Sequence, residues 1–120
     1  MKHFLSTSNW SREELESMLG LAAELKQNPV NSSLKGRSIA LLFLNPSLRT
    51  RTSFDLGMQQ LGGIAIVLQP GKDAWGLEFE PGTVMEGEAE EHIAEAAGVL
   101  SRYCDLIGIR AFPSFVDWSK

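Results

Sequence analysis

Residues 38–44 read Ser-Ile-Ala-Leu-Leu-Phe-Leu, and residues 45–54, which follow them, read Asn-Pro-Ser-Leu-Arg-Thr-Arg-Thr-Ser-Phe. The first stretch is continuously apolar rather than alternating, which predicts a strand buried on both faces, as in a parallel sheet. The second stretch is a polar turn that leads into a predicted helix over about 50–61, closed by Gly62 and Gly63. A buried strand followed directly by a helix begins a βαβ unit, so this stretch indicates the α/β class.

The rest of the chain continues the alternation of strands and helices. Residues 64–68 and 105–109 are two further predicted buried strands, and helices are predicted over about 12–27 and 89–102. Ser11 and Glu14 have the spacing of a capping box at the start of the first helix. Residues 69–87, with four glycines and two prolines, are predicted to be a long loop. The alternation predicts right-handed crossovers and a parallel sheet of at least three strands flanked by helices.

Composition limits the classes of protein to which the chain can belong. It has 120 residues, and its 15 acidic and 11 basic side chains give a net charge of −4. That balance argues against a protein that binds nucleic acid by neutralising its phosphates. No apolar run approaches the roughly 20 residues that cross a bilayer, and the first residues are too polar for a signal peptide. The single cysteine, Cys104, fits a small core residue in a reducing compartment, so we expect a cytoplasmic protein without a membrane partner.

The turn after the first strand concentrates cationic and hydroxyl groups at a predicted helix start. Residues 38–53 include Arg49 and Arg51 but no acidic residue. The first N–H groups of a helix lack intrahelical partners, and the helix dipole favours an anion beside them. A guanidinium adds a bidentate donor that suits phosphate or carboxylate oxygens. Because open parallel sheets bind ligands beyond the carboxyl ends of their strands, we interpret the turn as a phosphate site.

The motif by itself leaves a purely structural role open. Serine and threonine at a helix start are commonly caps, and arginines commonly form surface ion pairs. The sequence contains neither G-x-x-x-x-G-K-[ST] nor G-x-G-x-x-G after a strand, so the familiar nucleotide loops are absent. No set of His, Cys, Asp or Glu has the spacing of metal ligands, and we expect no metal.

The string NPSLRTRTSF (residues 45–54), with the downstream LGG, resembles the S-x-R-T-R signature of the aspartate/ornithine carbamoyltransferase family. The similarity extends over nearly the whole chain, through LQPGKDAW (68–75), EEHIAEAAGVLSRY (90–103) and DLIGIRAFP (105–113). It implies that residues 1–120 are the truncated N-terminal carbamoyl-phosphate-binding domain, without the second, amino-acid-binding domain. It also implies a homotrimer in arginine biosynthesis that uses no cofactor.

The resemblance implies a role for individual residues of the motif. Ser47, the backbone around Leu48, Arg49 and Thr50 correspond to the residues that hold the phosphate of carbamoyl phosphate. Arg110, directly after the third predicted strand, corresponds to the arginine that polarises the carbonyl, so Arg49 and Arg110 are the expected catalytic residues. Arg51 lies two positions from Arg49, about 200° around a helix, and is expected to have a structural role.

Two further residues acquire roles only through the resemblance. Trp75 lies in the long loop, where by itself it could pin the loop to its own chain. The resemblance implies instead that it completes the carbamoyl phosphate site of a neighbouring subunit. Glu90 corresponds to a substrate selector, since a glutamate would repel the extra carboxylate of an N-succinyl group. The adjacent Glu91 leaves a shift of one residue possible. His92 and His3 are weak candidates for the site, since His92 is expected to be solvated or paired and His3 is terminal.

The resemblance therefore implies an enzyme that carbamoylates the δ-amine of N-acetyl-L-ornithine, giving N-acetyl-L-citrulline and phosphate. Two alternatives stay open within the family, namely a preference for N-succinylornithine and a preference for ornithine. A third alternative belongs to another class: an inert phosphate-binding or assembly module. We expect these 120 residues to be inactive without the missing domain.

Overall fold

The computed structural model describes residues 2–87 and 89–112. The chain divides into two compact units, Met1–Asn31 and Ser32–Lys120. The first unit contains the short 3-10 helix η1 (Thr7–Asn9) and helix α1 (Arg12–Gln27). The second unit contains every strand of the described chain together with helices α2 and α3.

Helix α1 begins at the capping box that the sequence predicts. Ser11 Oγ accepts the N–H of Glu14 at 3.1 Å, and the Glu14 carboxylate accepts the N–H of Ser11 at 2.8 Å. That second hydrogen bond is the largest cause that lowers the pKa of Glu14, followed by its hydrogen bond from the Lys2 ammonium. The apolar residues of α1 are not buried: no residue of the helix is buried, and Leu19 is 71% exposed.

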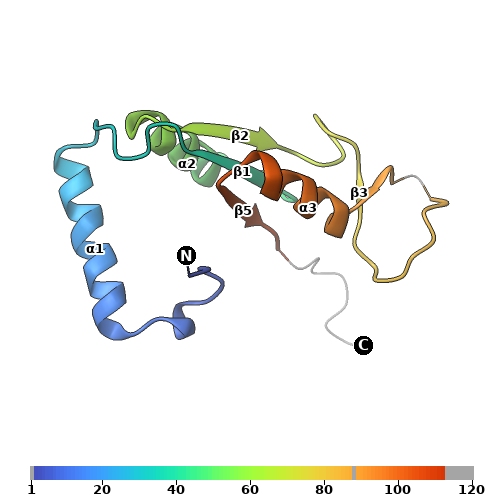
Figure 1. The fold of residues 1–120 in the computed structure, drawn as a ribbon, viewed down its shortest axis with the longest axis horizontal. Helices are drawn as coiled ribbons and strands as arrows, with labels where there is room; N and C mark the ends of the chain where they lie inside the picture. Colours follow the sequence, from blue (N-terminus) through green and yellow to red (C-terminus); the bar gives the residue numbers. More distant parts are fainter. Residues whose placement is uncertain (1, 88, 113–120) are drawn as a thin grey trace. The chain divides into compact units, whose positions relative to one another are not determined.

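The second unit is built on a parallel three-stranded sheet of order β2-β1-β5 (Figure 1). Its strands are β1 (Ser38–Phe43), β2 (Ile64–Leu68) and β5 (Leu106–Arg110). The α/β class with a parallel sheet of at least three strands is therefore confirmed.

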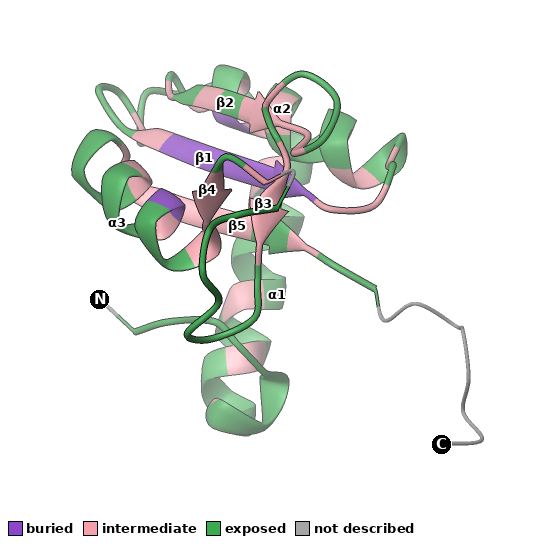
Figure 2. Cartoon of the chain, turned by 90° about the vertical axis from the view of Figure 1, so that its right-hand side faces the viewer, coloured by how far each residue is buried: buried purple, intermediate pink, exposed green. Residues whose placement is uncertain are grey.

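Strand β1 lies between the other two strands and forms the centre of the core. Figure 2 shows it as an almost continuous buried stretch. Its alternate residues Ile39, Leu41 and Phe43 pack with Met58 of α2 (Arg49–Gln60). Leu42, on the other face, borders a cavity with residues of α3 (Ile93–Tyr103). Helices on both faces explain why β1 is apolar without alternation, and each fully buried side chain of this size contributes about 1.5–3 kcal/mol.

Two predictions about residues 69–102 are wrong. Helix α3 starts at Ile93 rather than near residue 89, because Glu91–His92 is extended as β4 and His92 caps the helix. The predicted loop 69–87 contains β3 (Leu77–Glu78), which pairs in parallel with β4. The acidic residues before α3 resemble a helix start, but the backbone there pairs with a distant segment instead.

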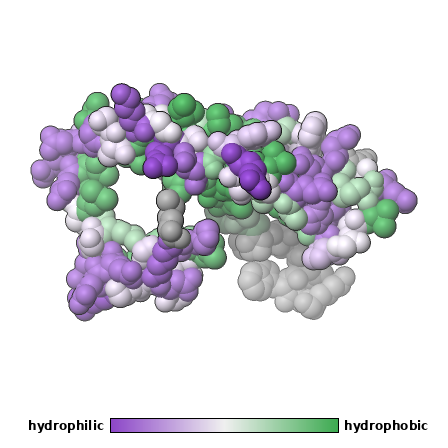
Figure 3. Space-filling model, in the orientation of Figure 1, coloured by the Kyte–Doolittle hydropathy of each residue, from purple (hydrophilic) through white to green (hydrophobic). Residues whose placement is uncertain are grey.

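Hydrophobic residues also reach the surface of the described chain, as the green patches among hydrophilic residues in Figure 3 show. Ile64 of the edge strand β2 is 58% exposed, and Ile109 of β5 is equally exposed. Among the described helices, none has both the length and the apolar character needed to cross a membrane.

Candidate functional site

The turn between β1 and α2 forms the start of the candidate site. Leu48 occupies the cap position of α2 but provides no side-chain hydrogen bond. Ser47 performs part of that role, since its Oγ accepts the N–H of Arg51 at 3.4 Å. The Ser53 hydroxyl donates to the Thr50 carbonyl at 3.1 Å, within the first turn of the helix. The turn is therefore fixed by its own hydroxyl groups, as the density of serine and threonine there suggests.

The side chains of this turn are open to solvent and carry positive charge. Arg49 and Arg51 are exposed, Leu48 is 80% exposed, and Ser47 and Thr50 are half-buried. A helix start whose first N–H groups lack intrahelical acceptors, together with two hydroxyls and an exposed guanidinium, can bind a dianion such as a phosphate group. We refer to Ser47–Thr50 as the anion cradle.

Arg110, on the adjacent strand, contacts the residue directly before the cradle. It is the last residue of β5, and its Nη1 donates to the carbonyl of Pro46 at 3.0 Å. Its guanidinium carbon lies 4.7 Å from the centroid of the Phe112 ring. The N–H of Phe112 in turn donates to Asn45 Oδ1 at 2.7 Å. These contacts fasten the segment after β5 to the segment after β1, and they place Arg110 beside the cradle at the carboxyl edge of the sheet.

Sequence reasoning missed the part of Asn45 and Pro46 in this arrangement. Both residues look like a strand terminator, and only the pairing of β1 with β5 shows that they hold the other segment. Arg51, for which the sequence predicts a structural role, joins the turn through its backbone, since its N–H donates to Ser47 Oγ at 3.4 Å.

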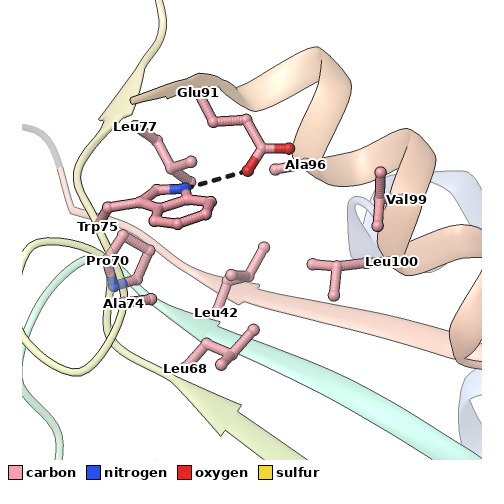
Figure 4. A pocket seen from close by; sticks show the side chains of 10 residues that line it. All are labelled: Leu42, Leu68, Pro70, Ala74, Trp75, Leu77, Glu91, Ala96, Val99 and Leu100. Carbon is pink, nitrogen blue, oxygen red and sulfur yellow. Dashed lines mark hydrogen bonds between the residues drawn. The ribbon is translucent and has the colours of Figure 1, made fainter. Parts of the chain in front are cut away.

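Trp75 lies in a different place, over an apolar cavity of its own chain (Figure 4). Its indole Nε1 donates to Glu91 Oε2 at 3.1 Å, while the residue stays 61% exposed. The cavity has a volume of about 180 Å³. Its lining consists of Leu42, Leu68, Pro70, Ala74, Trp75, Leu77, Glu91, Ala96, Val99 and Leu100. An apolar cavity whose one charged group is a carboxylate does not suit an anion, so the cradle and this cavity are separate features.

The structure distinguishes the two adjacent glutamates. Glu91 is half-buried and accepts the Trp75 indole N–H, whereas Glu90 is exposed. Of the two, Glu90 is therefore available to meet a molecule outside the chain. Among the residues that the structure describes, no group of three or more His, Cys, Asp or Glu is placed to hold a metal ion.

The comparisons with known proteins match the cradle and the whole surrounding fold. The family model for the carbamoyl-phosphate-binding domain of aspartate/ornithine carbamoyltransferases matches residues 2–119. A relative from Xanthomonas campestris, named N-acetylornithine carbamoyltransferase, is 68% identical over 120 residues, which are 100% of this chain and 35% of the relative. A Xylella fastidiosa protein of the same name is 61% identical over 119 residues, covering 99% and 35%.

More distant relatives include enzymes with another substrate in their names. An N-succinylornithine carbamoyltransferase from Bacteroides thetaiotaomicron is 39% identical over 106 residues, covering 87% of this chain and 33% of the relative. The chain thus spans about a third of the length of the curated relatives it matches.

Solved structures agree closely with the described fold. An acetylornithine transcarbamylase complexed with acetylcitrulline superposes with a TM-score of 0.93 at 67% identity, covering 99% of this chain and 36% of the other. A variant of N-acetyl-L-ornithine transcarbamylase, with one glutamate replaced by proline, superposes with a TM-score of 0.94 at 66% identity and the same coverage. That variant is complexed with carbamyl phosphate and N-succinyl-L-norvaline.

Proposed function

Because this chain belongs to the aspartate/ornithine carbamoyltransferase family, we propose that the whole protein transfers the carbamoyl group of carbamoyl phosphate to N-acetyl-L-ornithine. The products are N-acetyl-L-citrulline and inorganic phosphate, and the reaction serves arginine biosynthesis. In this proposal residues 47–50 and Arg110 bind carbamoyl phosphate. The second domain of the family binds the amino acid.

The observation that carries the proposal is the contact of Arg110 with Pro46, the residue directly before the cradle. Two segments far apart in the sequence are joined through the Pro46 carbonyl at 3.0 Å and the Asn45 side chain at 2.7 Å. Carbamoyl phosphate bound through its phosphate at the helix start would bring its carbonyl group within reach of Arg110, a second fixed cation. Inorganic phosphate would need only the helix start, whereas carbamoyl phosphate can bind both the helix start and Arg110.

The chemistry assigns a task to each group. The neutral δ-amine attacks the carbonyl carbon, a C–N bond forms, and the carbonyl oxygen takes up negative charge. Arg110 stabilises that oxyanion, since a fixed cation lowers a barrier in which charge develops. The C–O bond to phosphate then breaks, the phosphate leaves with the bonding electron pair, and the proton from the attacking nitrogen passes to the departing phosphate. Arg49 and the helix start stabilise the phosphate as its charge grows.

The choice of N-acetylornithine rests on Glu90. A neutral acetyl group can lie beside a carboxylate, whereas a succinyl group brings a second negative charge. Relatives at 61% and 68% identity carry the N-acetylornithine name, and the N-succinylornithine relative is 39% identical. Variants of N-acetyl-L-ornithine transcarbamylase in which one glutamate is replaced are complexed with N-succinyl-L-norvaline, which supports a selecting glutamate in that enzyme. Exposed Glu90, rather than Glu91, is its counterpart in this proposal.

We further propose that the whole protein is a homotrimer in which Trp75 enters the neighbouring site. Its 61% exposure is compatible with this role, because most of the residue's surface is accessible to a second subunit. The single cysteine supports a cytoplasmic location.

The test is a steady-state assay of the whole protein with carbamoyl phosphate and each of three acceptors: N-acetylornithine, N-succinylornithine and ornithine. The values of kcat/KM are compared, because their ratio measures the specificity for one acceptor over another. We expect the highest value for N-acetylornithine. A higher value for another acceptor would assign that substrate instead. Binding of carbamoyl phosphate without turnover of any acceptor would indicate the inert binding module.

A further inference from the structure

Residues 78–92 form a segment whose two ends are joined. Strand β3 pairs with β4 in the register Leu77↔Glu91 and Glu78↔His92. The chain therefore leaves this pair after Glu78 and returns to it at Glu91, so Glu90 lies directly before the point of return.

His92 uses both ring nitrogens at this junction. Its Nδ1 accepts the N–H of Ala94 at 3.1 Å, which caps α3. Its Nε2 lies 3.1 Å from the carbonyl oxygen of Glu80. A backbone N–H can only donate and a carbonyl can only accept, so both contacts are satisfied by the neutral ring with its hydrogen on Nε2. One side chain thus fastens the helix start to the far side of the segment.

Glu80 is held from its other side as well. The Glu78 carboxylate accepts the N–H of Phe79 at 2.8 Å and the N–H of Glu80 at 2.9 Å. The hydrogen bond from Glu80 is the largest cause that lowers the pKa of Glu78, followed by that from Phe79. The backbone of Glu80 is therefore held at both its N–H and its carbonyl, and the carbonyl is the group that the His92 ring contacts.

The residue before His92 is engaged on the cavity side. Glu91 accepts the Trp75 indole N–H at 3.1 Å and borders the cavity (Figure 4). Trp75 and Glu80 thus reach β4 from two parts of the loop that precedes it. Glu90 is exposed and directly precedes the two residues of β4 in the sequence.

We propose that His92 is a positioning residue, which holds Glu90 in place for substrate selection by clasping the carbonyl of Glu80. The inference rests on the proposed function, because it concerns the residue that selects the acyl group. His92 itself does not touch the substrate in this account. It acts by limiting the motion of residues 79–91.

Two variants of the whole protein distinguish the contact of His92 with the Glu80 carbonyl, which we call the clasp, from the cap that His92 provides to α3. In His92→Asn the side-chain oxygen can still cap α3, because asparagine is among the best N-caps, but the shorter side chain does not reach Glu80. In His92→Ala both contacts are lost. We expect both variants to lower the ratio of kcat/KM for N-acetylornithine to that for N-succinylornithine by about tenfold, the effect of about 1.4 kcal/mol. The dissociation constant of carbamoyl phosphate should change less than about twofold, well under that scale.

Hydrogen exchange of the same proteins gives a second readout. Amides of residues 79–91 should exchange faster in both variants, whereas the first turn of α3 should lose protection only in His92→Ala. If His92→Asn keeps the wild-type substrate ratio and wild-type exchange, His92 is only a cap and the proposal is overturned. Nitrogen NMR of the wild-type ring must also show the hydrogen on Nε2, and the other tautomer would contradict the clasp.

The outcomes also distinguish this inference from the proposed function. If the wild-type protein does not carbamoylate N-acetylornithine, the proposed function fails, and with it the selecting role. If it does so while the His92 variants keep the substrate ratio, only the positioning role fails.

Discussion

At the residue scale, the site depends on what each side chain is able to reach. Arg49 and Arg51 have the same charge and lie in the same first turn, yet the backbone N–H of Arg51 is tied to Ser47. Arg110 donates to the carbonyl of Pro46, in the turn after β1. The three arginines therefore have different contacts within the described chain, and single substitutions can compare their contributions to binding.

Arg49→Ala should weaken binding of carbamoyl phosphate to the whole protein by about 2–5 kcal/mol, the range for losing one partner of a desolvated charge pair. The reason is that its guanidinium is expected to bind the phosphate in a bidentate manner. Isothermal titration calorimetry measures the loss directly. Arg51→Ala is the matched control, and its affinity should stay much closer to wild type. Equal losses in the two variants would show that the two arginines act alike.

Glu90→Ala should raise kcat/KM for N-succinylornithine and lower it for N-acetylornithine. Removing the carboxylate removes repulsion of the extra charge, which costs several kcal/mol at a desolvated contact. Glu91→Ala is the control, because it removes the same charge from a residue that is hydrogen-bonded to Trp75. A shift in the substrate ratio with Glu91→Ala but not with Glu90→Ala would place the selector one residue later.

At the element scale, two junctions fix the sheet from which the site projects. At one, Asp105 accepts the N–H of Ser38 at 2.9 Å and the Arg37 guanidinium at 3.1 Å, which joins the starts of β1 and β5. At the other, Gly62 and Gly63 turn the chain from α2 into β2. Gly62 has a φ of 81°, a conformation that other residues rarely adopt.

The Asp105 junction should weaken in acid. The hydrogen bond from Ser38, followed by that from Arg37, lowers the pKa of Asp105 below its usual 3.8. The stabilisation is therefore complete above that usual value and is lost as the pH falls through the lower pKa of the folded protein. The titration of the Asp105 carboxyl, followed by carbon NMR, should have its midpoint below the usual value. In Arg37→Gln the midpoint should move upward, and a midpoint at or above the usual value in the wild type would contradict the junction.

Gly63→Ala should destabilise the protein by about 1–3 kcal/mol, the usual cost of overpacking. An added Cβ would lie 2.6 Å from Met58 Cε and 3.1 Å from the Arg37 carbonyl oxygen. Gly57→Ala is the control, because a Cβ there meets nothing within 4 Å. Alanine inside a helix should stabilise by about 0.5–1 kcal/mol relative to glycine. Urea unfolding followed by circular dichroism compares the two, and equal effects would contradict the tight α2–β2 turn.

At the scale of the whole molecule, the site is expected to be completed by a second subunit. Arg110 contacts Pro46, directly before the cradle of the same chain, whereas Trp75 donates to Glu91 and borders a separate cavity. In the proposed trimer each site takes Arg49 from one subunit and Trp75 from the next.

Mixing Trp75→Ala subunits with Arg49→Ala subunits should then restore activity that neither variant has. In a cyclic trimer of mixed composition, about one site in three receives both intact residues. The assay is carbamoyl transfer after dissociation and reassembly, with mass spectrometry to verify the mixed trimers. Each variant reassembled by itself is the control. Mixed trimers without recovered activity would show that Trp75 acts within its own chain.

The sequence by itself determined the α/β class, the parallel sheet and the position of the cradle. These features depend on local patterns: the unbroken apolar run at 38–43, the glycines at 62 and 63, and the hydroxyl-rich start of α2. The capping box at Ser11 and Glu14 is equally local, and its hydrogen bonds are present.

Only the tertiary structure decided where α3 begins, which glutamate is exposed, and what holds Arg110. Because β4 pairs with β3, residues 91 and 92 are extended and the helix begins only at Ile93. Glu91 belongs to this strand pair, whereas Glu90 lies before it and is exposed. The contact of Arg110 with Pro46 joins residues that are 64 positions apart. Each of these features depends on hydrogen bonds between segments that are distant in the sequence. The local sequence pattern of one segment does not specify which distant segment it pairs with.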